Sequence, residues 1–276
     1  MLFRALNILS HFGMSGFGQT PETYHLLGET QKIALLNRSG VADPDFFDIP
    51  LNELLSEAWA QEQADNIKFD RVLKPIEIPS GASEERKKHT GSSILIVDPQ
   101  GNIAILSSTL GDAFGSALMV PGYGFFLNNL LTEFSEDFPL IQGPQTEGWV
   151  SGGERPRGPE APTFVFKKGK PSLLLDAYGS GDPAAVLLNA LVQKIDLGAS
   201  CAQAVEFPRL LAQDEVLYVE SGLYDQGTVR LKLELLGHDL GKRDPIGLIQ
   251  MVCFDEGSDK ITGESDPRGN GQAAGF

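Results

Sequence analysis

The chain has 276 residues, of which 41% are hydrophobic, and a formal net charge of −15. This length and composition predict a folded protein with one substantial core or two small ones. The acidic balance argues against binding to nucleic acid or to an anionic membrane, because both need basic patches. The sequence also contains no apolar run that approaches the length of about eighteen residues needed to span a bilayer. From the charge and from this observation, we expect neither a nucleic-acid partner nor a membrane.

The chain begins with an apolar stretch that contains a single arginine. Residues 1–13, MLFRALNILSHFG, have the pattern of an amphipathic helix that ends at Gly13. The stretch lacks the small-residue cleavage site that ends a secretory leader. We therefore expect a cytoplasmic protein, or a truncated copy that has lost its leader.

A linker and a β-hairpin are predicted next. Gly81–Lys88 is a charged run that contains glycine and serine, which is typical of a flexible connection. Ile94–Val97 and Ile103–Leu106 are short apolar runs on either side of the turn residues PQGN. Runs of this kind fit strands that are covered on both faces, so we expect the hairpin to lie in the core.

Three hydroxyl side chains lie between the linker and the first strand, at Thr90, Ser92 and Ser93. A linker that brings a hydroxyl to the start of a strand suits self-cleavage, after which the new N-terminal residue serves as nucleophile. This segment is therefore the first candidate for a catalytic site.

The second half of the chain predicts helices that flank sheets. A helix rich in Ala, Val and Leu is expected from Asp182 to Ile195, after the turn YGSG. Taken alone, this is an ordinary strand-to-helix connection, capped by Asp182 with Pro183 at the first helical position. A further helix is expected over Ser200–Val205 and a strand over Val216–Glu220.

The four histidines, His11, His25, His89 and His238, have no metal-ligand spacing, and we predict no metal site. His238 follows Gly237, where a helix is expected to end, and a helix C-terminus favours histidine. His25 lies in an amphipathic helix, where we expect a packing or surface role.

The two cysteines, Cys201 and Cys253, lie far apart in the sequence and in no motif. We expect two separate thiols rather than a disulfide or a metal site. No cofactor is predicted.

Two sets of motifs, one on each side of the linker, carry a family resemblance. Before the linker lie ALNIL, YHLLGETQKIALLNR and ADPDFFDIP; after it lie FGS, VPGYGFFLNN, ERP, APT, AVEFPR, LLGH and ESDPRGNGQAAGF. In this order they resemble the γ-glutamyltransferase (γ-glutamyl transpeptidase) family. Residues 1 to about 75 resemble the end of its large subunit, and residues from about 90 to 276 resemble a complete small subunit.

The resemblance implies an α+β fold, the αββα four-layer sandwich of N-terminal-nucleophile hydrolases, incomplete because the start of the large subunit is absent. It implies a helical remnant over residues 1–80, a linker over 81–89 and a small-subunit-like sandwich over 90–276. The family's precursor cuts itself before a threonine, whose hydroxyl then attacks the substrate while its freed amine serves as base. The implied substrate is a small γ-glutamyl or other amide such as glutathione, and the implied partner is a large-subunit-like protein.

The nucleophile position departs from the family pattern. Pairing IVDPQGN with the family's hairpin without gaps places Gly91 there, with Ser92 and Ser93 at the following threonine and histidine positions. Glycine has no side chain that could attack, so this register removes self-cleavage and acyl transfer. A slip of one residue before the strand would place Thr90 there instead. Thr109, which in the family hydrogen-bonds the nucleophile, is kept.

The substrate-binding positions depart as well. The two serines that hold the carboxylate in the family are replaced by Gly158 and Pro159. Proline lacks an N–H group, and the neighbouring Glu160 would repel a carboxylate. The usual Gln or Glu is Leu130, whereas the amine-binding Asp is conservatively replaced by Glu133.

The oxyanion hole is implied at backbone N–H groups of Gly179 and Ser180, which can persist when side chains change. Two interpretations follow. In one, Thr90 or Ser92 performs γ-glutamyl or broader amide transfer, supported by Thr109 and the Gly179 loop. In the other, the chain is a catalytically silent homologue that acts as a binding module or as a subunit for a separately encoded large-subunit-like chain.

Overall fold

The computed structural model describes residues 1–35, 43–73, 90–134, 151–156, 158, 160–179, 181–213, 215–258 and 260–275, with the backbone alone for Leu35 and Thr90. The linker expected over residues 81–89 lies outside the described residues. The same is true of Pro159 and Ser180.

The first part of the chain is helical. Its helices are α1 (Leu2–Leu9), α2 (Met14–Phe17), α3 (Pro21–Leu35), α4 (Leu51–Leu54) and α5 (Glu57–Asn66). The helix expected over residues 1–13 is shorter, because the Ser10 hydroxyl donates to the Asn7 carbonyl at its end and Gly13 already precedes α2. Helix α3 is the central one, with Leu26, Leu27 and Ile33 buried.

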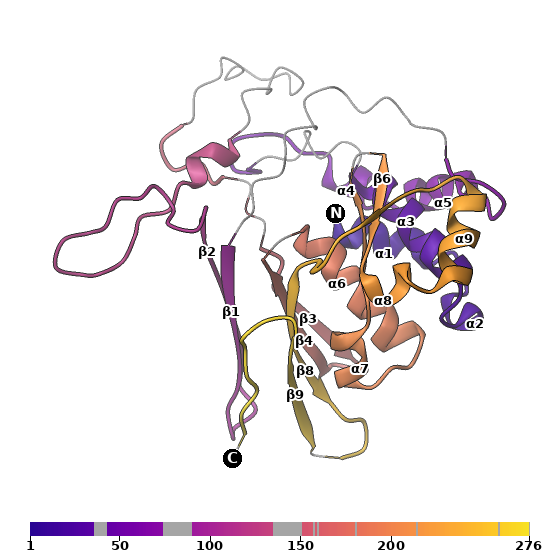
Figure 1. Ribbon diagram of the computed structural model, residues 1–276. Coiled ribbons are helices and arrows are strands. Elements are labelled where there is room, and N and C mark those ends of the chain that lie inside the picture. Colours follow the sequence, from indigo (N-terminus) through magenta and orange to yellow (C-terminus); the bar gives the residue numbers. More distant parts are fainter. Residues whose placement is uncertain are drawn as a thin grey trace.

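A four-stranded antiparallel sheet forms the centre of the molecule. It consists of β3 (Thr163–Lys167), β4 (Lys170–Tyr178), β8 (Leu248–Phe254) and β9 (Ile261–Ser265), in the order β3-β4-β8-β9. Helices α6 (Pro183–Leu191) and α7 (Cys201–Glu206) cover one of its faces (Figure 1). The expected helix starts are confirmed: Asp182 caps α6, and Ser200 forms a capping box with Gln203 at the start of α7.

A smaller three-stranded sheet lies among the helices. Its strands are β5 (Leu210–Gln213), β6 (Val216–Val219) and β7 (Asp239–Lys242), with β6 and β7 parallel. The strand expected from Val216 is therefore confirmed as β6. Two short helices, α8 (Ser221–Tyr224) and α9 (Gly227–Leu236), connect β6 to β7. Helix α9 ends at Gly237, whose φ of 99° suits a residue without a Cβ.

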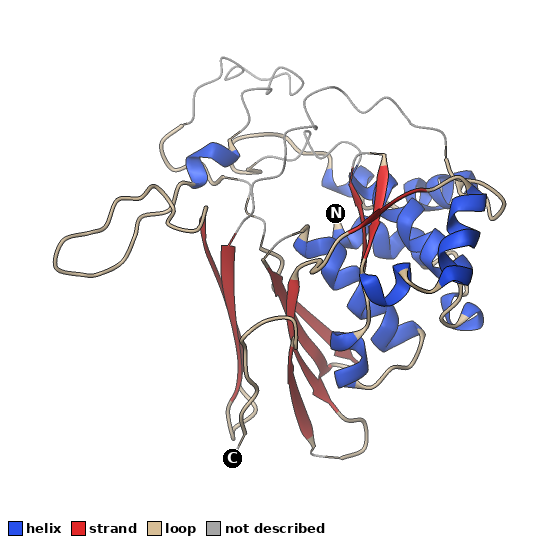
Figure 2. Cartoon of the chain, in the orientation of Figure 1, coloured by secondary structure: helices blue, strands red, loops and turns tan. Residues whose placement is uncertain are grey.

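The predicted hairpin forms from β1 (Thr90–Val97) and β2 (Ile103–Gly111), and packs against β4 and β8 on the side away from α6 and α7 (Figures 1 and 2). The expectation that it is covered on both faces is wrong. Ile94, Ile96 and Leu106 are 53%, 54% and 60% exposed. They stay open to solvent because the described residues supply no layer over that face.

The described chain is therefore an α+β protein with three layers: helices, the four-stranded sheet and the hairpin (Figure 2). The outer helical layer of a four-layer sandwich is not formed by the described residues. One hydrophobic core joins the two parts of the chain, since Leu27 of α3 belongs to the same buried cluster as Leu187 of α6 and Leu217 of β6.

Cys201 and Cys253 form a disulfide, so the expectation of two separate thiols is wrong. Cys201 opens α7, and Cys253 lies in β8, on which α7 packs. Residues 52 positions apart in the sequence thus come within a Cα–Cα distance of 6.2 Å. Sequence spacing outside a motif could not show this contact.

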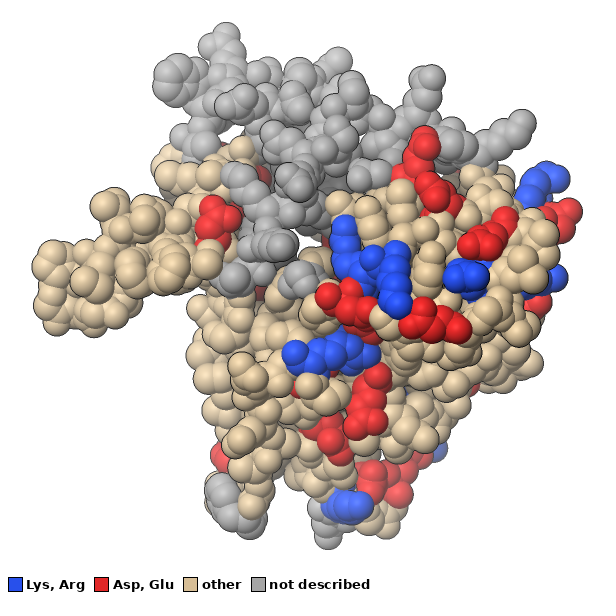
Figure 3. Space-filling model, in the orientation of Figure 1, with Lys and Arg blue, Asp and Glu red and all other residues tan. Residues whose placement is uncertain are grey.

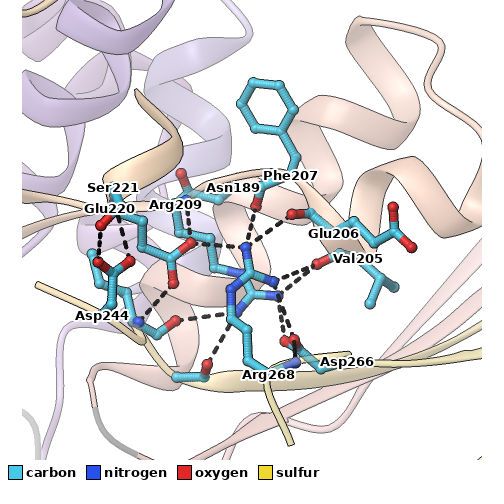
Figure 4. Close-up of polar contacts among 12 residues, drawn as sticks. Asn189, Val205, Glu206, Phe207, Arg209, Glu220, Ser221, Asp244, Asp266 and Arg268 are labelled. Atoms are coloured by element: carbon cyan, nitrogen blue, oxygen red, sulfur yellow. Dashed lines mark hydrogen bonds and ion pairs between the residues drawn. The ribbon is translucent and has the colours of Figure 1, made fainter. Parts of the chain in front are cut away.

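A buried ionic network ties the C-terminal segment to the rest of the fold (Figure 4). Arg209 donates to Asp266 at 2.6 Å, and both side chains are only 1% exposed. Arg268 donates to Glu220 at 2.8 Å, and the same Glu220 oxygen accepts the Arg209 backbone N–H. The SDPRG segment of the last motif therefore has a structural role at Asp266 and Arg268.

Candidate functional site

The candidate site lies where the hairpin begins, beside the end of β4. The register pairs Gly91 with Thr109 and Thr90 with Gly111, with an irregularity between the first two residues of β1. A Cβ built on Gly91 would lie 3.4 Å from the Tyr178 Cβ and 3.9 Å from the Thr109 Cβ. A side chain at position 91 would therefore point toward the four-stranded sheet, between β2 and β4.

A cavity of about 20 Å³ lies at this point, large enough for about one water molecule. The structure thus brings together three positions that the sequence singled out: Gly91, Thr109 and Gly179. The residues that line the cavity are Gly91, Ser107, Ser108, Thr109, Glu160, Ala177, Tyr178, Gly179 and Pro183.

Thr109 keeps its place opposite residue 91. Its hydroxyl oxygen accepts the Gly111 N–H at 3.0 Å. Gly111 has a φ of 83°, and a Cβ there would collide with the side-chain oxygen of Asn129. Asn129 is itself fixed by donating to Asp112 at 2.6 Å. A larger side chain at position 111 therefore has no room here, because Asn129 occupies the space.

Gly179 leaves β4 with a φ of 87°, a conformation that favours glycine. The turn continues through Gly181 and leads to the Asp182 cap of α6. Of the two predicted oxyanion donors, Gly179 lines the cavity, and Ser180 lies outside the described residues. The predicted role of the turn stays a prediction.

The position at which the resemblance predicts carboxylate binding lies beside the carboxylate of Glu160. A Cβ on Gly158 would collide with the Glu160 carboxylate, and Glu160 also lines the cavity. A serine hydroxyl at position 158 would therefore meet Glu160 in its present position. Because like charges repel, a carboxylate ligand is disfavoured here.

Glu133, the predicted amine-binding residue, ends the 3₁₀ helix Leu130–Glu133. It is not among the described residues that line the Gly91 cavity. A second, open cavity of about 690 Å³ lies between Leu130–Phe134 and the Ser151–Pro156 segment, and Glu133 does not line that cavity either. Unlike Thr109 and Gly179, Glu133 therefore does not line the Gly91 cavity, and its predicted role stays a prediction.

An ion pair that the sequence did not reveal joins two of the motifs. Arg155, from ERP, donates through its side chain to Asp43 at 2.5 Å and to Asp45 at 2.6 Å, both from ADPDFFDIP. The Arg155 backbone N–H also donates to Asp43 at 2.8 Å. These bonds hold the pKa of Asp43 well below its usual range. The segments before and after residues 81–89 are thus held together by more than the covalent chain.

Several known proteins are similar to this chain in sequence. The model of the gamma-glutamyltranspeptidase family matches residues 1–276. The glutathione hydrolase proenzyme of Bacillus subtilis (strain 168) is 30% identical over 299 residues, covering 100% of this chain and 49% of that protein. The chain spans about half the length of the curated relatives that it matches.

Two solved structures are similar to this one. Gamma-glutamyltranspeptidase from Pseudomonas nitroreducens, complexed with L-DON, superposes with a TM-score of 0.55 and 25% identity, over 68% of this chain and 99% of that chain. Cephalosporin acylase from Bacillus halodurans superposes with a TM-score of 0.79 and 22% identity, over 100% of this chain and 48% of that chain. The second likeness, at its low identity, shows the fold alone.

Proposed function

Since the chain belongs to the gamma-glutamyltranspeptidase family, we propose that it is a catalytically silent member. It keeps the fold of the family's N-terminal-nucleophile hydrolases and performs no γ-glutamyl transfer or hydrolysis. The observation that carries this proposal is that Gly91, which the resemblance puts at the nucleophile position, pairs with Thr109 across the hairpin. Glycine offers no atom for nucleophilic attack.

The surroundings of Gly91 support the proposal independently. The cavity beside it has room for about one water molecule, and the Glu160 carboxylate lines it. Substrate recognition in this family requires a site that attracts a carboxylate, whereas Glu160 would repel one. A γ-glutamyl group carries its own free carboxylate. The described residues therefore disfavour both the binding of a γ-glutamyl group and nucleophilic attack on it.

The test is turnover of glutathione and of a chromogenic γ-glutamyl anilide, measured as released glutamate and aniline. We expect no release above the background of a doubly substituted Thr90→Ala/Ser92→Ala variant. Turnover that the wild-type chain shows and the double variant loses would overturn the proposal.

That outcome would establish the second candidate function, γ-glutamyl or broader amide transfer through Thr90 or Ser92. Thr90 is the first residue of β1, next to the irregularity that a shifted register needs, and this observation favours it. Thr109 and Gly179 already line the cavity. Loss of the residues that bind a carboxylate would remove specificity for γ-glutamyl groups, whereas acyl transfer itself does not require them.

We further propose that the silent chain acts as a subunit. Two exposed apolar surfaces would be stabilised by burial against a partner. They are the outer face of the hairpin, with Ile94, Ile96 and Leu106, and an arm over residues 113–129. The arm contains no charged residue and projects from the molecule (Figure 3). Its exposed large apolar side chains are Phe114, Leu118, Met119, Tyr123, Phe125 and Leu127.

The partner that fits is a large-subunit-like polypeptide, because the curated relatives have about as much chain again as this sequence spans. Such a polypeptide would pair with the open edges of the hairpin and cover its apolar face. It would be encoded separately from this chain.

Co-purification with a separately expressed large-subunit-like polypeptide tests this proposal. We expect Ile96→Asp to abolish the association, whereas Leu231→Asp, at an apolar position on α9 with a similar exposed fraction, should leave it intact. Equal binding of both variants, or no binding of the wild-type chain, would rule out the hairpin face as the interface.

The location of the protein is a separate question. The cytoplasm is expected from the sequence, but the Cys201–Cys253 disulfide favours an oxidising compartment, because cytosolic thiols are kept reduced. No helix among the described residues is long and apolar enough to cross a membrane. Thiol alkylation in freshly lysed cells decides between the two: a blocked pair indicates an oxidising compartment, and two labelled thiols indicate the cytoplasm.

A further inference from the structure

Three side chains that the sequence separates meet in the interior of the helical part. His25 and Glu29 lie four residues apart on α3, and His238 follows the end of α9. All three are buried. His25 Nδ1 and His238 Nε2 are 2.7 Å apart, and one ligand atom from each of the three residues lies within 4.8 Å of the others. Sequence spacing gives no sign of this cluster.

The hydrogen bonds define the tautomers of the two neutral rings. His25 Nε2 lies 2.7 Å from the Lys68 carbonyl oxygen, which can only accept, so in a neutral ring Nε2 donates and His25 Nδ1 holds a lone pair. In a neutral His238 ring, Nε2 then donates to that lone pair, and the other nitrogen, Nδ1, also holds a lone pair.

This lone pair is buried and faces a carboxylate. Among the described residues, His238 Nδ1 has no hydrogen-bond partner, and it lies 3.9 Å from Glu29 Oε1. Glu29 is oriented by the Leu73 N–H, which donates to its Oε2 at 2.6 Å. Two electron-rich atoms that face each other without a proton between them form an arrangement that a cation would stabilise.

Lys32 now supplies the nearest positive charge. Its ammonium donates to Glu29 Oε1 at 2.7 Å, and its side chain is 21% exposed. The ammonium can therefore turn toward solvent without disturbing α3. Its departure would free a carboxylate oxygen beside the unpartnered nitrogen of His238.

We propose that His238 Nδ1 and Glu29 Oε1 form a binding site for a divalent transition-metal ion of the zinc class, which displaces the Lys32 ammonium. Imidazole and carboxylate groups both suit Zn²⁺. Tetrahedral coordination of a zinc ion would place the two atoms roughly 3.4 Å apart, so they must move about 0.5 Å closer than their present distance of 3.9 Å. His25 is a positioning residue, since it accepts the other ring N–H of His238 and fixes that ring. Water would complete the coordination in the space that Lys32 leaves.

The test is calorimetric titration of the full, untagged chain with Zn²⁺ alone. We expect one equivalent to bind to the wild-type chain and to His11→Gln, a matched control that removes a histidine from the surface pair with Glu57. Binding should be lost in His238→Gln. In Lys32→Met it should be tighter by about tenfold or more, because the buried carboxylate then lacks its competing counter-charge.

Thermal unfolding provides a second readout in case His238→Gln fails to fold. Lys32→Met should unfold at a lower temperature than the wild-type chain without zinc and regain the difference with zinc, because a ligand of the folded state stabilises it. Absence of zinc binding by the wild-type chain would overturn the proposal. Binding that a folded His238→Gln retains, or that Lys32→Met weakens, would overturn it too.

Discussion

Gly91 of β1 and Thr109 of β2 face each other across the hairpin, beside the end of β4. The resemblance predicts that the Thr109 hydroxyl supports a nucleophile at residue 91, where glycine supplies none. The backbone places residue 91 beside Tyr178 and Gly179. What this position lacks is therefore a reactive side chain, because the backbone is already in place.

Restoring a hydroxyl at this position is therefore informative. A Cβ at residue 91 would lie 3.2 Å from the Ser108 carbonyl oxygen, so the neighbouring strand must yield by a few tenths of an ångström. We expect Gly91→Thr to fold and to show partial self-cleavage before residue 91 on a denaturing gel. The control, Gly91→Ala, adds the same Cβ without a hydroxyl and should stay uncut. Identical behaviour of the two variants would mean that the hydroxyl is not what is missing.

The Cys201–Cys253 disulfide should contribute measurably to stability. A cross-link that closes a loop of this length restricts the unfolded chain and typically contributes about 2–4 kcal/mol. We expect Cys253→Ser to lower the free energy of unfolding in urea by that amount. Adding a reductant to the wild-type chain should have the same effect and should leave Cys253→Ser unchanged. A reductant effect on the variant would show that another bond is responsible.

Removal of one partner from the Arg209–Asp266 pair should be among the most damaging single changes. Both side chains are buried, and Asp266→Asn would leave the Arg209 guanidinium without its counter-charge. The expected loss in the free energy of unfolding is about 3–5 kcal/mol. Glu256→Gln breaks the exposed pair with Lys167 and should cost less than about 1 kcal/mol. Equal costs for both variants would refute a special role for the buried network.

The Arg155–Asp43 pair predicts a specific acid sensitivity. Arg155 holds the pKa of Asp43 below its usual range, so the pair stabilises the folded state above the ordinary aspartate pKa, and this contribution is lost as the pH falls through the lowered value. We expect the stability of the wild-type chain to decrease from about pH 4 downward. Arg155→Met should be less stable at pH 7 and should lose less on acidification. Parallel pH profiles for the two proteins would contradict this account.

Local signals in the sequence predicted the helices well. Asp182 and Ser200 are capping residues, and both helices begin where these residues indicate. Gly237 likewise marks the end of α9. The family motifs predicted the α+β class. They also predicted that Thr109 and Gly179 belong to one site, and both residues line the same cavity.

The sequence did not predict contacts between residues that lie far apart along the chain. Ile94 and Ile96 belong to a continuous apolar run, which does not tell whether a second layer covers them, and the structure leaves them exposed. The Cys201–Cys253 disulfide and the contact between His25 and His238 depend on elements that pack together only in the folded chain. No local pattern in the sequence encodes such contacts.

The most direct test of the central claim is the intact mass of the purified chain under denaturing conditions after prolonged incubation. Denaturing conditions are needed because the Arg155–Asp43 ion pair and the shared core would hold fragments together. A silent Gly91 predicts a single species of 29.8 kDa. Two fragments of about one-third and two-thirds of the chain, the larger beginning at Thr90 or Ser92, would contradict the account and establish a working N-terminal nucleophile.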